Sequence, residues 1–491
     1  MITININNVY CQIIGLTDTN IINVIDDKLS YYVAGYNFTW AYKTARWNGK
    51  QHLLNKQLKF QTGLLSIVED ILKYHNLEYQ LEDKRIEPVL GKEIKLNLNY
   101  YTPRDYQFAI VDACLKEKCG IVKAATGSGK SLSISMLIGK TNIKTVVYVV
   151  SIDLLYQTKK AIEEALNIEV GVVGDGQCII KKITVALPMT IMHGFDKDYE
   201  PFDDDEGKIK KENLDSLSKI KIQKMVENAQ MFIFDEAQYL SAITFQLIAK
   251  NSKNARYRYG FSGTPWRDDG ADLGLTAATG KQLIDIDATS LINKNVLVSP
   301  KIYFFNVPEI DGYEASSHNK KPYPAIYDVF ITNNEIRNKM VIESLEKLYN
   351  KGRKVLILIR RKKHGLNLLE MVPKHIRAYF LSGDANSDER EAVKELFNAD
   401  GVDVIIASQI FDVGIDLPKL DALILAGGGK SSTRALQRIG RIIRSFPGKK
   451  DAVVVDLIDN CQYLFLHSRK RHKIYKTEPA FQIKLPDGIN W

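Results

Sequence analysis

Two long regions of the chain alternate short apolar runs with longer amphipathic stretches. Apolar strands separated by helices are typical of a parallel sheet whose two faces are both covered. The pattern therefore predicts an α/β fold with two tandem parallel-sheet domains. The expected strands lie at 120–125, 145–151, 183–188, 231–236 and 257–263 in the first region, and at 354–360, 377–383, 402–408, 421–427 and 452–458 in the second.

The first 95 residues follow a different pattern, in which short alternating stretches precede one amphipathic segment at 62–76. This pattern predicts a small N-terminal α+β domain. A break that contains several prolines separates the two sheet domains. The expected bounds are 1–95 for the accessory domain, 96–300 for the first sheet domain with a charged insert at 196–224, 301–332 for a linker, and 333–491 for the second sheet domain.

Basic and aromatic residues are mixed within the accessory domain, between residues 40 and 56. Such a mixture can grip a nucleic-acid backbone, which makes Lys43, Arg46 and Lys50 candidates for contacts with nucleic acid. The same composition also fits a solvated sheet face above buried aromatic side chains. The sequence leaves both interpretations open.

Composition and charge narrow the class of protein. The 491 residues are 45% apolar and 25% charged, as in ordinary globular proteins, and the net charge of +9 suits a polyanionic partner. The five cysteines are scattered without a CxxC pair, which disfavours a zinc site or a disulfide framework. The chain has neither a signal-peptide pattern nor an apolar run of membrane-spanning length. We therefore expect a soluble, cytoplasmic protein without a membrane partner.

The strongest local signal is AATGSGKS at 124–131, which follows an expected strand and precedes an expected helix. Gly127 and Gly129 have no Cβ, so the backbone there can approach phosphate oxygens, and the helix that follows presents free N–H groups to the anion. In such a loop Lys130 reaches the β- and γ-phosphates, and Ser131 is a ligand of Mg²⁺. The segment therefore predicts a nucleotide site.

An acidic pair, Asp235 and Glu236, ends the apolar run at 231–236. The carboxyl ends of parallel strands border the crevice in which open α/β sheets bind ligands. We expect Asp235 to hold Mg²⁺ through water, and Glu236 to orient or deprotonate the attacking water. Together with Lys130, the pair predicts nucleotide hydrolysis rather than nucleotide storage.

The second sheet domain contains QRIGRIIR at 437–444, where arginines recur at helical spacing. Residues three apart share a helix face, so we expect Arg441 and Arg444 to reach one anion together. Guanidinium groups in such a place act as arginine fingers on a γ-phosphate. A basic surface helix is the alternative.

Taken in order, these segments resemble the motifs of superfamily 2 helicases, and the resemblance covers residues from about 100 to 460. PRDYQ (103–107) resembles the Q motif, AATGSGKS motif I, VSIDLLYQT (150–158) motif Ia, VALPMTI (185–191) the next strand-contacting motif, DEAQ (235–238) motif II, SGTP (262–265) motif III, LILIRRKKH (356–364) motif IV, SQIFDVGIDLP (408–418) motif V, and QRIGRIIR motif VI. One departure is Gln238, where many relatives have His.

The resemblance implies two RecA-like domains with ATP between them and Mg²⁺ as the cofactor. It assigns ATP binding to Arg104, Gln107, Thr126, Gly127, Ser128, Gly129, Lys130, Ser131, Gly414 and Asp416; catalysis to Lys130, Asp235, Glu236, Gln238, Arg441 and Arg444; coupling to Ser262 and Thr264; and strand contacts to Thr190 and Gln409.

The segments at 47–65 and 262–280 are further similar to phage UvsW-type branch-migration helicases, which have XPB-like and restriction-translocase cousins. This similarity implies an ATP-dependent DNA helicase that acts on branched, duplex and single-stranded DNA. Its processes would be branch migration, fork regression and Holliday-junction processing. A restriction-type DNA translocase, an RNA helicase and a nucleotide-gated clamp without turnover stay open as alternatives. The sequence names no protein partner.

Overall fold

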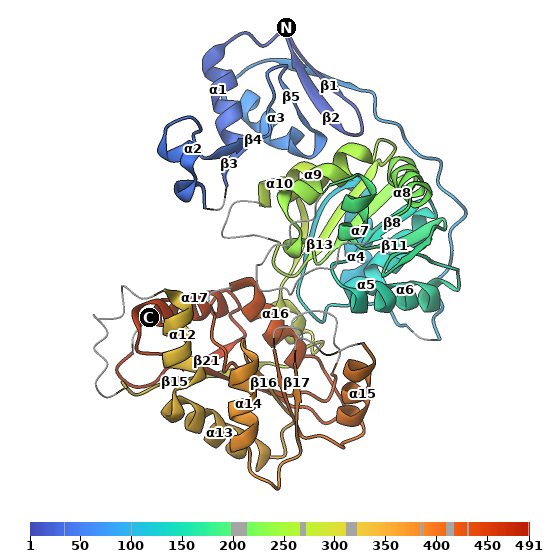
Figure 1. Ribbon diagram of the computed structural model, residues 1–491. Coiled ribbons are helices and arrows are strands. Elements are labelled where there is room, and N and C mark those ends of the chain that lie inside the picture. The colour runs from blue at the N-terminus through green and yellow to red at the C-terminus, as the bar shows by residue number, and fades with distance from the viewer. Residues whose placement is uncertain are drawn as a thin grey trace. The chain divides into compact units, whose positions relative to one another are not determined.

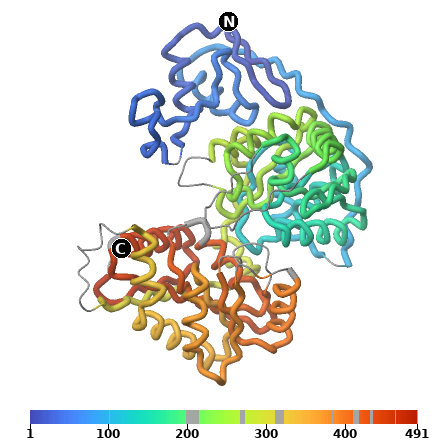
Figure 2. The backbone as a smooth tube through the Cα atoms, viewed as in Figure 1, coloured from blue at the N-terminus to red at the C-terminus, as the bar shows by residue number. Residues whose placement is uncertain are grey.

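The computed structural model describes the chain except for residues 34, 100, 198–213, 266–271, 311–321, 383–384, 386, 409–416, 430–431 and 490. The described residues form two compact units (Figures 1 and 2). The first unit comprises Met1–Ala124 and Gly129–Asp285, and the second comprises Ala125–Ser128 and Ile286–Trp491. Among the helices of this described part, none has both the length and the apolar character needed to span a membrane.

The N-terminal region of the first unit is a small sheet covered by two helices. It contains β1 (Ile2–Ile6), β2 (Tyr10–Ile14), α1 (Thr19–Lys28), β3 (Ser30–Tyr32), η1 (Tyr36–Phe38), α2 (Trp40–Lys43), β4 (Lys50–His52), β5 (Lys59–Gln61), η2 (Thr62–Leu64), α3 (Leu65–Tyr74) and β6 (Tyr79–Asp83). The main sheet has the order β5-β2-β1-β6, and β3 pairs with β4 separately. Alternate residues of β1 are buried, because one face of this sheet packs on the apolar sides of α1 and α3.

This N-terminal region packs directly on the first large sheet domain. Ala277, on the far side of that contact, belongs to the same apolar core as the N-terminal strands. Gly63 allows the close approach, since a Cβ there would lie 2.1 Å from the carbonyl oxygen of Thr276. Asn8 Nδ2 donates to Lys253 O at 3.2 Å, and Arg256 Nε donates to Glu87 at 2.8 Å. These contacts explain why the region belongs to the same compact unit.

The first unit contains an eight-stranded sheet of order β10-β9-β11-β8-β12-β13-β7-β14. Its strands are β7 (Cys119–Ala124), β8 (Thr145–Tyr148), β9 (Gly171–Gly174), β10 (Gln177–Ile179), β11 (Ile183–Ala186), β12 (Met231–Asp235), β13 (Tyr257–Ser262) and β14 (Gln282–Ile286). The helices are α4 (Asp105–Glu117), α5 (Lys130–Thr141), α6 (Ile152–Leu166), α7 (Pro188–Gly194), α8 (Ser216–Asn228), η3 (Ala237–Tyr239), α9 (Ala242–Asn251) and α10 (Asp272–Thr279).

The six central strands, from β9 to β7, are parallel. The helices α4, α5 and α6 pack side by side, and α7, α8 and α9 form a second group on the other side of the sheet (Figure 1). This arrangement confirms the α/β prediction and all five strands expected in the first region. The last residues of the charged insert form the first two turns of α8, a helix whose Ile222 and Val226 are buried.

The second unit contains a seven-stranded parallel sheet of order β17-β18-β16-β19-β20-β15-β21. Its elements are α11 (Ala288–Asn293), β15 (Pro300–Asn306), α12 (Tyr323–Tyr327), the π-helical turn η5 (Asp328–Thr332), α13 (Glu335–Tyr349), β16 (Val355–Leu358), α14 (Lys362–Met371), β17 (Ala378–Leu381), α15 (Ser387–Asn398), β18 (Val404–Ala407), β19 (Ala422–Ile424), α16 (Ser432–Ile442), β20 (Ala452–Ile458), α17 (Gln462–Tyr475) and β21 (Gln482–Lys484).

All five strands expected in the second region are present as β16 to β20. The expected linker at 301–332 is different, because its first residues form β15, which pairs with β20 along seven residues. Ile302 and Phe304 are buried at alternate positions of this strand. The nearby prolines obscure this short alternation in the sequence, but Pro300 occupies the first strand position, where proline is tolerated.

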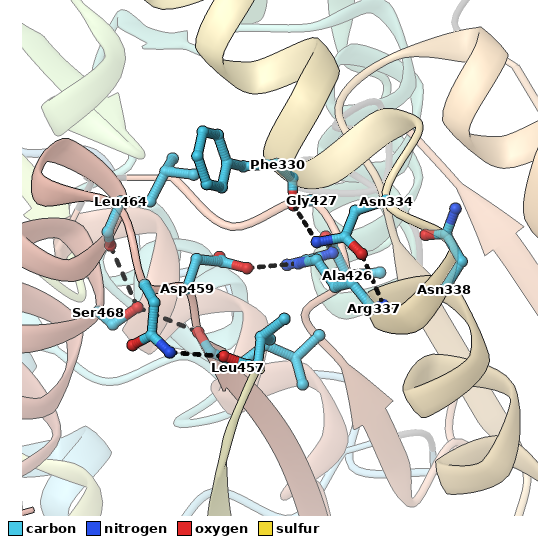
Figure 3. Close-up of polar contacts among 12 residues, drawn as sticks. Phe330, Asn334, Arg337, Asn338, Ala426, Gly427, Leu457, Asp459, Leu464 and Ser468 are labelled. Carbon is cyan, nitrogen blue, oxygen red and sulfur yellow. Dashed lines mark hydrogen bonds and ion pairs between the residues drawn. The ribbon is translucent and has the colours of Figure 1, made fainter. Parts of the chain in front are cut away.

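A buried ion pair joins three segments of the second unit (Figure 3). Arg337, in the first turn of α13, donates from Nε to Asp459 at 2.6 Å and from Nη1 to Ala426 O at 2.6 Å. Both charged side chains are buried. Asn334 caps the same helix by accepting the N–H of Arg337 at 3.0 Å. Because Asp459 follows β20 and Ala426 follows β19, one guanidinium ties α13 to the ends of two strands.

Replacing this arginine should destabilise the second unit. In an Arg337→Met protein the buried Asp459 carboxylate has lost its counter-charge, which costs about 3–5 kcal/mol when one partner of a buried pair is removed. The expected result is a clearly lower urea midpoint, followed by circular dichroism. Lys339→Met, at an exposed position on the same helix, is the matched control. Equal midpoints for the two variants would contradict the structural role of the pair.

Candidate active site

The loop between β7 and α5 has the backbone geometry of an anion cradle. Gly127 and Gly129 have φ values of 87° and 78°, in the left-handed region that favours glycine. The N–H of Ser128 donates to Ala125 O at 3.1 Å, which closes the turn. Lys130 is the first residue of α5, so the loop leads directly to a helix N-terminus. Residues 125–131, among them Thr126 and Ser131, therefore form a cradle suited to phosphate.

Gln107 ties the start of α4 to this loop. Its Oε1 accepts the backbone N–H of Arg104 at 2.9 Å, and its Nε2 donates to Gly129 O at 3.2 Å. The side chain is buried, whereas Arg104 is exposed. Gln107 therefore supports the loop by direct contact. That Gln107 and Arg104 also bind ATP stays a prediction.

The acidic pair lies at the end of β12, next to Lys130. Glu236 has a φ of 50°, a left-handed conformation that is costly for a residue with a side chain and that turns the chain sharply out of the sheet. The Lys130 Nζ lies 3.2 Å from Glu236 Oε1, and both Lys130 and Asp235 are buried. Burial, together with the neighbouring Glu236 carboxylate, raises the pKa of Asp235, while the Lys130 charge lowers it.

Gln238 connects the acidic pair to the strand β13. Its Nε2 donates to Glu236 Oε2 at 2.8 Å, and its Oε1 accepts a hydrogen bond from the Ser262 hydroxyl. The Ser262 Oγ in turn accepts the backbone N–H of Thr264 at 2.9 Å. A continuous line of polar contacts therefore runs from Lys130 through Glu236 and Gln238 to the SGTP segment. The amide of Gln238 serves this line because it donates and accepts at once.

Arg441 and Arg444, two of the three arginines of QRIGRIIR, do not share a helix face. Arg441 lies on α16, which ends at Ile442, so Arg444 is beyond the helix. Arg444 instead forms an antiparallel bridge with Leu297, and Val298 donates its N–H to Ile443 O at 2.8 Å. The helix therefore ends two residues before Arg444, which the spacing argument requires it to include. Helical spacing therefore does not explain how Arg441 and Arg444 could contact the same anion.

The residues expected to contact DNA differ in their exposure. Thr190 is buried on α7, which packs against α8 and α9. Its side chain is therefore not exposed for contact with a DNA strand. Lys50 forms an ion pair with Asp27 and lies 5.2 Å from the Tyr32 ring centre. Lys43 and Arg46 are exposed. Gln409, Gly414 and Asp416 lie outside the residues that the structure describes.

Sequence reasoning gave no role to the buried arginines of the second unit. Arg471 pairs with Asp456 at 2.6 Å and donates to Gly429 O at 2.7 Å, much as Arg337 holds Ala426 O. These contacts fix the turn that precedes α16, the helix of QRIGRIIR. The available signal was a carboxylate inside the apolar run at 452–458, since a charge in such a strand needs a buried partner.

Two family models match the chain in the order of its two sheet domains. The model described as "Type III restriction enzyme, res subunit" matches residues 100–267, and the model described as "Helicase conserved C-terminal domain" matches residues 338–446. The first match contains the phosphate loop and the acidic pair, and the second contains Arg441 and Arg444. The chain belongs to the superfamily 2 helicases.

Individual relatives support this assignment to the superfamily 2 helicases. The DNA 3′-5′ translocase XPB2 of Sulfurisphaera tokodaii is 25% identical over 85% of this chain and 94% of its own length. The ATP-dependent DNA helicase uvsW of Enterobacteria phage T4 is 23% identical over 88% of this chain and 86% of its own length. A structure of S. cerevisiae Dbp5 bound to RNA and ADP BeF3 has a TM-score of 0.54 at 14% identity, covering 79% of this chain and 91% of the other, which shows the shared fold.

As a superfamily 2 helicase the chain is an ATP-driven motor enzyme, and its residues also fit a magnesium ion. Asp235 and Glu236 carry two carboxylates close to a single ammonium group, so a cation there would offset an excess of negative charge. Carboxylate and hydroxyl oxygens, which Asp235 and Ser131 supply, are the hard ligands that Mg²⁺ takes, usually together with water and phosphate.

Removing the Gln238 amide should reduce the stimulation of ATP hydrolysis by nucleic acid without reducing ATP binding. In a Gln238→Ala protein Glu236 and Ser262 lose their common partner, while the phosphate cradle is unchanged. We expect nucleic-acid-stimulated hydrolysis to fall about tenfold, equivalent to one hydrogen bond to a charged group, with little change in ATP affinity. Gln238→His is the matched control, since an imidazole can donate to Glu236 and accept from Ser262. Unchanged stimulation in the alanine variant would contradict this coupling.

Proposed function

We propose that this helicase is a DNA motor that acts on branched DNA, in branch migration, fork regression and Holliday-junction processing. Two relatives named for DNA translocation and DNA unwinding support DNA as the track. The observation that carries the preference for branches is an exposed aromatic and basic surface on the N-terminal region. The motor supplies movement, and this surface selects the substrate.

In the proposed hydrolysis, the chain first exchanges one ion pair for another. Lys130 leaves Glu236 for the phosphates of ATP, which removes the salt bridge that neutralises the Glu236 carboxylate. Glu236 then accepts a proton from the attacking water, while Gln238 holds its other oxygen. Ser131, and Asp235 through water, would hold Mg²⁺, which would supply positive charge to the phosphates. Arg441 and Arg444 act on the γ-phosphate in the transition state.

The same exchange provides a signal for movement. A change in the charge or position of the Glu236 carboxylate acts on Gln238 through their hydrogen bond. Gln238 in turn accepts a hydrogen bond from Ser262 at the end of β13. Ser262 also holds the backbone of Thr264. A change in the charge balance at Glu236 therefore alters the position of the SGTP segment, which links hydrolysis to the grip on the strand. A motor of this kind advances because successive nucleotide states hold the strand differently.

The surface proposed to select branches is the aromatic lobe, residues 30–52, which contains β3, η1, α2 and β4. Phe38 is 77% exposed and Trp40 is 63% exposed, so the alternative of buried aromatics does not apply to these two. The guanidinium carbon of Arg46 lies 4.4 Å from the Trp40 ring centre. Exposed aromatic faces stack on unpaired bases with about 1–3 kcal/mol per base. Unpaired bases are available where DNA arms separate, which distinguishes a junction from a plain duplex.

Steady-state ATPase measurements with a panel of nucleic acids test the function. The panel contains single-stranded, duplex, forked and four-way DNA, and single-stranded RNA of the same sequence, with Lys130→Ala as the control for contaminating hydrolysis. We expect the largest stimulation by forked or four-way DNA. Equal stimulation by RNA would support an RNA helicase instead. Binding without turnover on every substrate would support a nucleotide-gated clamp.

The aromatic lobe should determine the preference for junctions. In a Phe38→Ser, Trp40→Ser protein the stacking surface is lost, and we expect about tenfold weaker binding of four-way DNA, in line with one or two stacked bases. The ATPase rate at saturating single-stranded DNA should be unchanged. Tyr74→Ser is the control, because Tyr74 is an exposed aromatic on α3, outside the lobe. Junction affinity that is equal in the double variant and in the control would refute the role of the lobe.

A further inference from the structure

A cleft of about 960 Å³ lies in the first unit, away from the phosphate cradle. Its walls are the connector at 89–91, the residues just before β8, the segment at 178–182 and the second half of α8. Residues 142–144, 181–182 and 230 precede β8, β11 and β12, so the cleft lies at the amino ends of these parallel strands. The acidic pair lies at the opposite, carboxyl end of β12. A ligand in the cleft therefore leaves the nucleotide site free.

The rim of this cleft is basic. Its lining contains five exposed lysines, which are Lys144, Lys181, Lys182, Lys221 and Lys224, and no Asp or Glu among the residues that the structure describes. Lys181 pairs with Glu169 at 2.8 Å, and Lys182 donates to Asn142 at 2.6 Å. Within the described part of the chain, the other three lysines have no ion pair. The rim thus presents positive charge to an anionic ligand.

The interior of the cleft is apolar. Ile143, Val146, Met225 and Ala229 are buried side chains in its lining. At the mouth, Val89 is 91% exposed and Leu90 is 46% exposed. Adjacent exposed apolar residues beside an apolar hollow mark a surface that a partner covers.

The connector that forms one wall is held in place, so the cleft is preformed. The N–H of Gly91 donates to Thr141 O at 3.0 Å, and Asn142 Nδ2 donates to Lys92 O at 2.7 Å. A Cβ on Gly91 would lie 2.5 Å from Asn142 O, so only glycine permits this approach. Figure 2 shows the connector running along the first unit between the N-terminal region and the larger sheet domain.

We propose that this cleft binds an acidic peptide segment of a partner protein. The peptide places apolar or aromatic side chains in the hollow and its carboxylates against the lysine rim. The combination of an apolar interior and a basic rim favours a peptide over nucleic acid. A phosphodiester backbone would satisfy the lysines but leave the apolar interior unfilled.

Fluorescence anisotropy with the full-length protein tests the proposal. The probe is a fluorescein-labelled octapeptide of four aspartates followed by Leu-Phe-Leu-Phe. Two control peptides replace either all four aspartates by asparagine or all four apolar residues by serine. We expect binding of the probe and much weaker binding of both controls, because the cleft needs charge and apolar surface together.

Variants locate the binding to the cleft. Lys221→Glu with Lys224→Glu should weaken the probe at least about tenfold, since two attractive pairs become repulsive. Val89→Ser with Leu90→Ser should also weaken it, without a change in melting temperature, because both side chains are exposed. Lys160→Glu with Lys250→Glu, which are exposed on α6 and α9, should leave the probe affinity unchanged apart from general charge effects.

Three results would overturn the proposal. The first is no binding of the probe, and the second is an equal loss in the cleft and control double variants. The third is displacement of the probe by a twenty-nucleotide oligo-dT whose own binding is lost in the Lys221, Lys224 variant, which would make the cleft a nucleic-acid site. None of these outcomes depends on the ATPase panel, so the proposed DNA function is tested separately.

Discussion

The candidate active site depends on one ion pair, between the buried ammonium of Lys130 and the carboxylate of Glu236. Lys130 begins α5, yet its partner Glu236 follows β12, more than 100 residues later in the chain. A lysine without a counter-charge is costly to bury, so the pair holds the phosphate cradle and the acidic pair in register. The pair is also replaceable, because phosphate oxygens offer the lysine a stronger negative partner. In the proposed mechanism this replacement starts hydrolysis.

The two sheets have the same construction but use buried charge differently. In the first, Lys130 and Asp235 place buried charge beside the carboxyl ends of β7 and β12, where a ligand can meet it, and Arg258 on β13 holds backbone carbonyls at Ala255 and Ser252. In the second, Arg337 and Arg471 are paired internally and hold the backbone at Ala426 and Gly429. Their charges stabilise the shape of the turn before α16 rather than bind a substrate. The first sheet therefore carries the acidic pair, and in the second sheet buried arginines hold the turn that leads to α16.

Two surfaces lie outside the motor machinery, and both combine exposed apolar side chains with unpaired or loosely held positive charge. On the aromatic lobe, flat rings and Arg46 suit stacking on bases. In the cleft beside α8, aliphatic side chains and lysines suit an acidic peptide. The two surfaces differ in their side chains, since one has exposed rings and the other has aliphatic side chains in a hollow, and this difference decides which ligand each surface fits. Recruitment by a protein and selection of a junction can thus act on one motor independently.

Local pattern by itself determined most of the fold. Ten expected strands are present because a strand buried on both faces must be continuously apolar, a requirement that is visible in a few residues. The GSGKS loop and the DE pair were likewise identifiable, since their chemistry lies in adjacent residues. The strand β15 was missed because its buried positions are Pro300, Ile302 and Phe304, so only two of them carry a typical strand residue, and Pro308 follows it closely.

Tertiary structure decided what depends on residues far apart in the chain. The partners of Gln238 come from β12 and β13, so no spacing predicts them. Helical spacing predicted one face for Arg441 and Arg444, but pairing with Leu297 ends the helix first. Thr190 is buried because α7 packs against α8 and α9, a packing that the sequence does not predict. The cleft with the lysine rim is lined by residues from separate segments of the chain, namely the connector at 89–91, the segment at 178–182 and α8. The sequence shows which side chains are suited to burial or to ligand binding. Which of these side chains contact one another is decided by the packing of segments that are far apart in the chain.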